Sequence, residues 1–369
     1  MNEVSNQMKD SYLKLRIRRI LWSQGYHCPL EVDLSHFDYE DKEQTLKRNP
    51  LTDIDVLGIR FEPDLRTTTI IVDCKSGKES EPNRIFWLRG VMDFFGAEEG
   101  ILLKKILHNH ARAIAPKLGI RVLDEKGLDI LEKTLAIETF PFDVGDIVVY
   151  NRMASLWGIE VKSNQKPTDK QLAIKNVYQY LQYQYWMVDE YKNIQNLIER
   201  FARIRLELHA KDIKAKYLAY IGLQRLVLSI LRMASDVASR DLSDIRSQSD
   251  TYLFGGAFSL SERKRIIGLL NKLTEHYNIN EQINLEPPYF DELVEIVNKI
   301  ILNSLHAVKM LQHLDVVIMK YVLDSAENIE RSLGTAYSTE ALVLVKRIAT
   351  MFQRSAGLEE DMFEELKLL

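Results

Sequence analysis

Hydrophobic and polar positions follow one pattern in the first third of the chain and another in its second half. Residues 11–26, SYLKLRIRRILWSQGY, carry apolar side chains at helical spacing, and Gly25 ends the predicted helix. The run HCPLEVDL predicts a short strand. Residues 53–61 (DIDVLGIRF) and 67–75 (TTTIIVDCK) predict two longer strands, and the turn EPDLR between them favours antiparallel pairing.

The segments that follow alternate helix with strand. The pattern predicts a helix over residues 84–97, a buried strand over residues 100–106, and then helix, strand and helix as far as Leu135. The order α-β-β-β-α-β-α-β-α is typical of an α/β fold with a mixed sheet and helices on both faces. We therefore predict an α/β domain over residues 1–135.

The pattern changes again after residue 135. Two further strand-like runs predict a bridging β segment over residues 136–167. TDKQ, starting at Thr168, is a capping-box signature, and apolar residues beyond it recur at helical spacing, as at Leu293, Ile296 and Ile300. Residues 168–369 are thus predicted to form an all-α domain, which we expect to serve in assembly or in substrate or partner binding.

Composition narrows the class of protein. The 369 residues carry 49 basic and 53 acidic side chains, which gives a net charge of −4. A chain with this charge can bind nucleic acid only through a local basic patch on its surface. Cys28 and Cys74 lie too far apart in sequence to suggest a disulfide framework or a zinc site. The first residues lack the apolar region of a signal peptide, and no uncharged apolar stretch reaches about 18 residues. We expect a cytoplasmic protein with no membrane span.

Acidic residues stand where the two predicted antiparallel strands should be apolar. Asp55 lies between Ile54 and Val56, and Asp73 and Lys75 close the second strand on one face of it. Burying a carboxylate is costly unless a cation meets it. Two facing carboxylates suit Mg²⁺, which can lower the pKa of a bound water, while a lysine can orient that water and screen charge on a phosphate. The pattern therefore favours metal-dependent phosphodiester hydrolysis.

Asp55 followed by Asp73-Cys74-Lys75, on paired strands between helices, resembles the core motif of the PD-(D/E)XK, or restriction-endonuclease-like, nuclease superfamily. The order of elements is similar to that of Mrr-like restriction endonucleases and archaeal Holliday-junction resolvases, over about residues 1–135. The resemblance implies that Asp55, Asp73 and the backbone carbonyl of Cys74 bind Mg²⁺ or Mn²⁺, and that Lys75 is catalytic. The first helix has only Asp10 where many members of the superfamily carry a glutamate.

A second run offers an alternative site. Asp146 is followed by Glu160-Val161-Lys162, which repeats the acid and acid-x-lysine arrangement. This run could hold the active centre, or a second one. It could also be a hairpin on the sheet in which Glu160 and Lys162 form a solvated ion pair.

The resemblance implies a Mg²⁺-dependent endonuclease that hydrolyses DNA phosphodiester bonds. A nuclease domain joined to a helical domain fits a prokaryotic restriction or antiphage defence effector. A repair or junction nuclease, and a non-catalytic DNA-binding scaffold that retains the nuclease fold, are the alternatives. For the helical half, with its aromatic cluster at residues 178–186, we expect a homo-oligomer or a partner protein subunit.

Overall fold

The computed structural model describes residues 2–40, 45–75, 79–139, 142–158, 168–277, 283–322 and 329–367. Its first nine elements follow the predicted order. They are α1 (Asn2–Ser23), β1 (Leu30–Glu40), β2 (Thr45–Phe61), β3 (Thr67–Lys75), α2 (Glu81–Phe95), β4 (Glu99–Lys104), α3 (Asn109–Ile114), β5 (Ile120–Leu123) and α4 (Glu125–Thr134).

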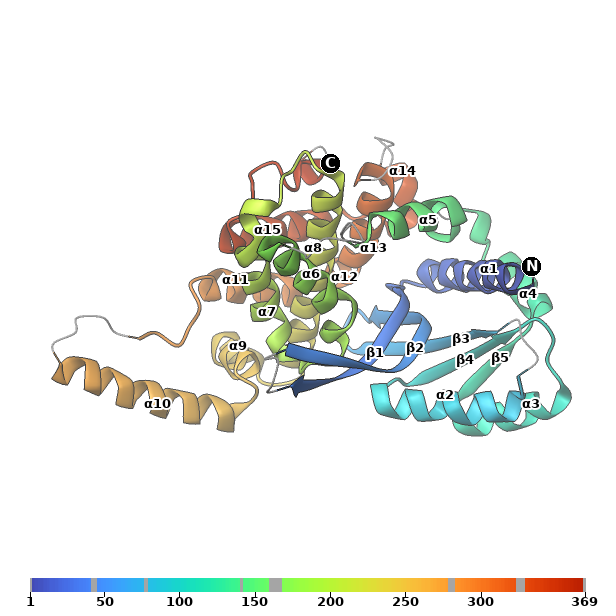
Figure 1. The fold of residues 1–369 in the computed structure, drawn as a ribbon, viewed down its shortest axis with the longest axis horizontal. Helices are drawn as coiled ribbons and strands as arrows, with labels where there is room; N and C mark the ends of the chain where they lie inside the picture. The colour runs from blue at the N-terminus through green and yellow to red at the C-terminus, as the bar shows by residue number, and fades with distance from the viewer. Residues whose placement is uncertain are drawn as a thin grey trace.

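The five strands form one mixed sheet in the order β1-β2-β3-β4-β5. The β1–β2 and β2–β3 pairs are antiparallel, whereas β3–β4 and β4–β5 are parallel. Helices α1 and α4 lie on one side of the sheet, and α2 and α3 lie on the other (Figure 1). The predicted mixed sheet between helices is confirmed, and β3, at the centre of the strand order, is buried from Ile70 to Cys74.

The predicted bridging β segment is wrong for the part that the structure describes. Residues 147–156 form helix α5 (Ile147–Leu156), and Asp146 caps it by accepting a hydrogen bond from the Val148 amide at 2.8 Å. Val149 and Leu156 are buried at helical spacing, so packing outweighs the strand preference of the Ile-Val-Val run. Residues 159–167 lie outside the described residues.

The half of the chain from residue 168 onward is helical, as predicted. Helix α6 starts with the predicted capping box of Thr168 and Gln171. The helices are α6 (Asp169–Gln182), α7 (Asn193–Ile204), α8 (Ile213–Ala238), α9 (Ile245–Leu253), α10 (Ala257–His276), α11 (Phe290–Leu302), α12 (Ser304–Ala307), α13 (Met310–Val316), α14 (Ile329–Leu333), α15 (Thr339–Ala356) and α16 (Glu364–Lys367).

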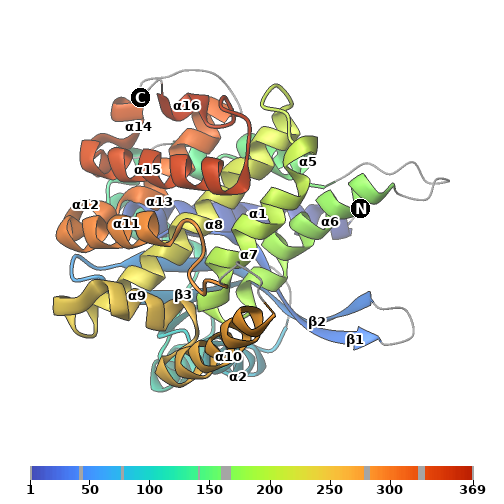
Figure 2. The same ribbon diagram turned by 90° about the vertical axis from the view of Figure 1, so that its left-hand side faces the viewer.

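Helix α8 is the core of this half. Within the described ranges it is the one helix that is long and apolar enough to cross a membrane. Of its most apolar stretch, however, 89% is buried inside the protein. Helices α6, α7, α11, α13 and α15 pack against it, so this packing accounts for its apolar sequence (Figures 1 and 2).

The sheet and the helical half share one continuous hydrophobic core. A buried carboxylate joins them. Asp315 on α13 accepts hydrogen bonds from Trp22 of α1 (Nε1 to Oδ2, 3.1 Å) and from Gln224 of α8 (Nε2 to Oδ1, 2.7 Å). His27, which precedes β1, lies 3.4 Å from Asp315 Oδ1 through Nδ1. The boundary predicted at residue 168 thus separates two architectures that fold around one core.

Replacing Asp315 tests how strongly this contact holds the two halves together. Asp315→Ala leaves the buried donors of Trp22 and Gln224 without their acceptor. We expect it to lower the free energy of unfolding by about 3 kcal/mol, as measured by urea denaturation. The exposed acid Asp361 is the matched control, and Asp361→Ala should change the free energy of unfolding by less than about 0.5 kcal/mol. Equal effects of the two variants would contradict this role of Asp315.

Candidate active site

Strand pairing brings the two predicted acids together. Val56 of β2 lies opposite Val72 of β3, so the antiparallel register places Asp55 and Asp73 one residue further along, on the same face. Both residues are buried, at 3% and 2% exposure. Lys75 Nζ lies 3.7 Å from Asp55 Oδ2 and 3.6 Å from Asp73 Oδ1. The lysine therefore bridges two carboxylates that would otherwise repel each other.

Helix α1 supplies a second lysine that the sequence did not single out. Lys14 Nζ lies 2.7 Å from Asp55 Oδ1 and 2.6 Å from Glu31 Oε1. Burial lowers the pKa of Lys14, but the two carboxylates raise it further than burial lowers it, so the net pKa is raised. Lys14 is thus held as an ammonium ion against Asp55.

Helix α2 supplies the partner of the second acid. Arg84, in the first turn of α2, donates from Nε to Asp73 Oδ2 at 2.9 Å and from its terminal nitrogen to Oδ1. The guanidinium also lies over the ring of Trp87, 3.8 Å from its centroid. Burial raises the pKa of Asp73, and Arg84 and Lys75 offset only part of that rise. Arg84 therefore fixes the orientation of Asp73 with both carboxylate oxygens occupied.

The charge on Lys75 follows from the same arrangement. Partial burial lowers the pKa of its amine, whereas Asp55 and Asp73 raise it, and the net pKa lies above the usual value for lysine. With the site as the structure shows it, Lys75 is a cation at neutral pH. It can therefore stabilise negative charge on a substrate.

A cluster of acids opens from Asp55 toward solvent. One carboxylate oxygen each from Glu31, Asp53 and Asp55 lie within 4.8 Å of one another, with Glu31 and Asp53 exposed and Asp55 buried. Carboxylate oxygens are the ligands that Mg²⁺ and Mn²⁺ prefer, and here Lys14 already pairs with two of the three acids, Glu31 and Asp55. Among the described residues, Asp73 does not belong to this cluster. Asp55 thus has acidic neighbours on its solvent side, Glu31 and Asp53, in addition to Asp73, to which Lys75 joins it.

Cys74 contributes to the site through its backbone. Its amide donates to Asp55 Oδ2 at 2.7 Å. Because a strand residue directs its N–H and its carbonyl to the same edge, the Cys74 carbonyl also faces β2. The thiol is fully buried, and burial raises its pKa well above the usual value, so we expect it to be unreactive.

Lys14, Arg84 and Glu31 were not predicted from the sequence to be site residues. Each has one feature in the sequence or the backbone that sets it apart. Lys14 flanks the apolar stripe of the first predicted helix, and Arg84 is the first basic residue of the helix after Lys75. Glu31, the second residue of β1, has a backbone φ of 52°, which is uncommon for a residue other than glycine. None of these three features shows, without the fold, which residues the side chain will contact.

Of the three residues of the alternative site, the structure describes Asp146. Asp146 is the N-cap of α5 and lies outside the five strands of the sheet. Glu160 and Lys162 lie outside the described residues. The capping bond of Asp146 gives that residue a local structural role.

Comparison of the chain with models of known protein families, with curated proteins and with solved structures finds no match in any of the three.

Proposed function

We propose that this protein is a metal-dependent nuclease that hydrolyses DNA phosphodiester bonds, with Asp55, Asp73 and Lys75 at its centre. The observation that carries the proposal is the position of Lys75 between two buried carboxylates on paired strands. Burial of both acids is costly, and it occurs next to an acidic cluster that reaches solvent. Perturbed and clustered titratable groups of this kind are typical of active sites.

Each residue has a part in this proposal. Mg²⁺ or Mn²⁺, held by Asp55 with Asp53 and Glu31 or with Asp73 and the Cys74 carbonyl, would supply a Lewis acid and a water of lowered pKa. Lys75 is placed to stabilise negative charge on the phosphate. Arg84 acts as a positioning residue for Asp73, and Lys14 does the same for Asp55.

The wider role is also proposed. A nuclease fold combined with a helical half supports restriction or antiphage defence, with DNA repair or junction cleavage as the alternative. A non-catalytic DNA-binding scaffold is the second candidate, and one observation favours it. Arg84 occupies both oxygens of Asp73, and Lys14 occupies Asp55, so the site is closed by its own ion pairs.

Conservative substitutions distinguish catalysis from a structural ion-pair network. We expect Asp55→Asn, Asp73→Asn and Lys75→Met each to lower the rate of DNA cleavage by about 100-fold or more, because the three side chains act as one unit. A double variant should be little worse than a single one. Rates are measured on linear, supercoiled and single-stranded DNA, with thermal unfolding of each variant as the check on folding.

Two controls accompany these variants. Asp93→Asn alters an exposed acid that pairs with Arg89 on α2, and it should leave cleavage unchanged. Lys162→Ala tests the alternative site and should also be neutral. Normal cleavage by Lys75→Met together with an inactive Lys162→Ala would move the active centre to the second run. Absence of cleavage by the wild type on every DNA form would favour the scaffold.

Metal dependence is tested by cleavage in the presence and absence of metal, and by direct measurement of metal binding. Mg²⁺ and Mn²⁺ should support activity and excess EDTA should abolish it, because the available ligands are hard oxygens. Calorimetric titration with Mn²⁺ identifies the ligands. Asp53→Asn should weaken Mn²⁺ binding by about tenfold if the acidic cluster binds the metal, and Asp73→Asn should do so if the resemblance holds. Undiminished cleavage in EDTA would refute the metal mechanism.

We also propose that the helical half assembles two copies of the protein. Helix α10 exposes apolar side chains at helical spacing, with Ile266, Leu269 and Leu273 each at least half exposed. It projects from the body of the protein (Figure 1). A second copy is the occupant that fits cleavage of both strands of a duplex, since two active sites are then related by symmetry.

Light scattering tests the assembly. Wild-type protein should be dimeric at tens of micromolar, and the double variant Leu269→Glu, Leu273→Glu should be monomeric, because two charges cannot be buried unpaired at the interface. The matched control on the same helix is Lys272→Gln, which should remain dimeric. A wild-type protein that is monomeric at this concentration would refute self-assembly through α10.

A further inference from the structure

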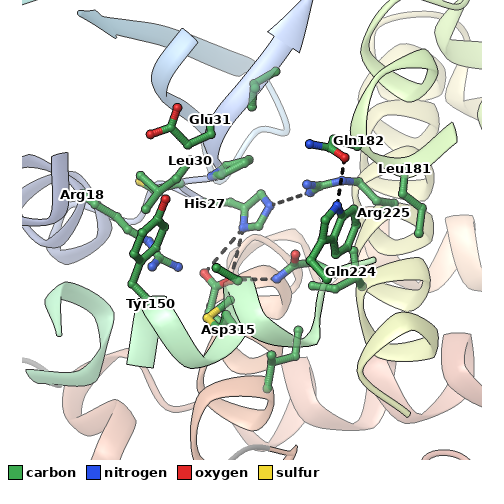
Figure 3. Close-up of a pocket in the computed structure, with 18 of the residues that line it drawn as sticks. Arg18, His27, Leu30, Glu31, Tyr150, Leu181, Gln182, Gln224, Arg225 and Asp315 are labelled. Carbon is green, nitrogen blue, oxygen red and sulfur yellow. Dashed lines mark hydrogen bonds and ion pairs between the residues drawn. The ribbon is translucent and has the colours of Figure 1, made fainter. Parts of the chain in front are cut away.

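A cavity of about 260 Å³ lies between the sheet and the helical half. Its walls come from α1, the start of β1, α5, α6, α8 and the segment that begins with α13 (Figure 3). Four aromatic side chains contribute to the lining: Tyr150, Trp157, Trp186 and Tyr217. Cavities of this composition are typical of small-molecule sites, and the volume of this one lies just below their usual range of about 300–1,000 Å³.

Arg18 is the unusual residue of this cavity. Its side chain is only 6% exposed, and its Nε is buried without an acceptor. Within the part of the chain that the structure describes, its guanidinium makes no hydrogen bond and no ion pair. A buried charge without a partner lowers the stability of the folded protein by roughly several kcal/mol. Such a charge is therefore expected where a bound ligand supplies the opposite charge.

Arg225 faces the same cavity from α8. It is 9% exposed and lies over the ring of Trp186, 4.5 Å from its centroid. One terminal nitrogen lies 3.3 Å from His27 Nε2, while its Nε has no acceptor among the described residues. Burial lowers the pKa of Arg225 to about 10, which leaves it charged at neutral pH.

The charges of the lining leave a positive surplus. Asp315 is the buried acid, and Trp22, Gln224 and His27 already surround it. Burial lowers the pKa of His27 despite the neighbouring Asp315, so this imidazole is neutral at pH 7. Glu31, at the rim, is paired with Lys14. One acid within the cavity therefore stands against two arginines, and Figure 3 shows Arg18 and Arg225 on either side of His27 and Asp315.

We propose that this cavity binds a small aromatic anion, a carboxylate or a phosphate monoester, through Arg18 and Arg225. The anionic group meets the unpartnered guanidinium of Arg18, for which such oxyanions are the natural partners. The ring packs among the aromatic side chains, and the volume admits little more than one ring with its anionic group. This inference is independent of the proposed nuclease activity, because it rests on a different set of contacts.

Calorimetric titration of the full chain with benzoate and with phenyl phosphate tests the proposal, with neutral benzamide as the comparison. At least one of the two anions should bind with a stoichiometry of one and a Kd below about 1 mM, and benzamide should bind about tenfold more weakly or not at all. Arg18→Met should weaken anion binding by about tenfold or more. Arg152→Met, which alters an exposed arginine on α5, should leave it unchanged.

Thermal unfolding without ligand gives a second readout. Arg18→Met replaces an unpaired buried charge by an apolar side chain, so it should leave the unfolding temperature of the ligand-free protein unchanged or raise it. The anion should stabilise the wild type and not this variant. The proposal would be overturned if neither anion bound to the wild type, or if the bound anion were retained with full affinity by Arg18→Met.

Discussion

The buried carboxylate of Asp315 is the contact on which the arrangement of the molecule depends. It lies on α13, near the end of the chain, and it satisfies donors from α1 near the beginning and from α8 in the middle. A carboxylate in such a place is tolerated only if its oxygens remain hydrogen-bonded. The three segments must therefore fold together, and the orientation of α1 relative to the helical half is fixed by the same bonds.

That orientation positions both candidate sites. Lys14 and Arg18 lie one helical turn apart on α1, so one helix presents an ammonium group to the carboxylate of Asp55 and a guanidinium to the cavity. Glu31 belongs to both places, since it lines the cavity and is a member of the acidic cluster. The two sites are thus neighbours that share a helix and a side chain, although different charges define them.

The ion pairs of the acidic site are compatible with a structural role and with a functional one. Lys14, Lys75 and Arg84 compensate two buried carboxylates, which is what a structural network needs. The same cations are the groups that can bind a phosphate or orient a metal ligand. Burial of the two carboxylates is consistent with either role. The exposed acids Glu31 and Asp53 lie beside the network and connect it to solvent.

Three features could be predicted from the sequence: the order of elements in the first 135 residues, the pairing of β2 with β3, and the closeness of Asp55, Asp73 and Lys75. These features depend on periods of two and 3.6 residues and on one short turn, all of which are local. The same local reasoning failed at residues 147–156, because burial of one helix face against the rest of the protein outweighed strand propensity.

The distant side chains that complete the two sites could not be predicted from the sequence, because tertiary packing brings them there. Lys14 and Glu31 come to Asp55, and Arg84 comes to Asp73, from elements whose sequence spacing carries no record of the contact. The cavity is built from helices separated by some 200 residues in the chain, with Arg18 on one and Arg225 on another. Such contacts arise from the packing of elements that are far apart along the chain. Hydrophobic periodicity reports only on local structure, so it does not predict them.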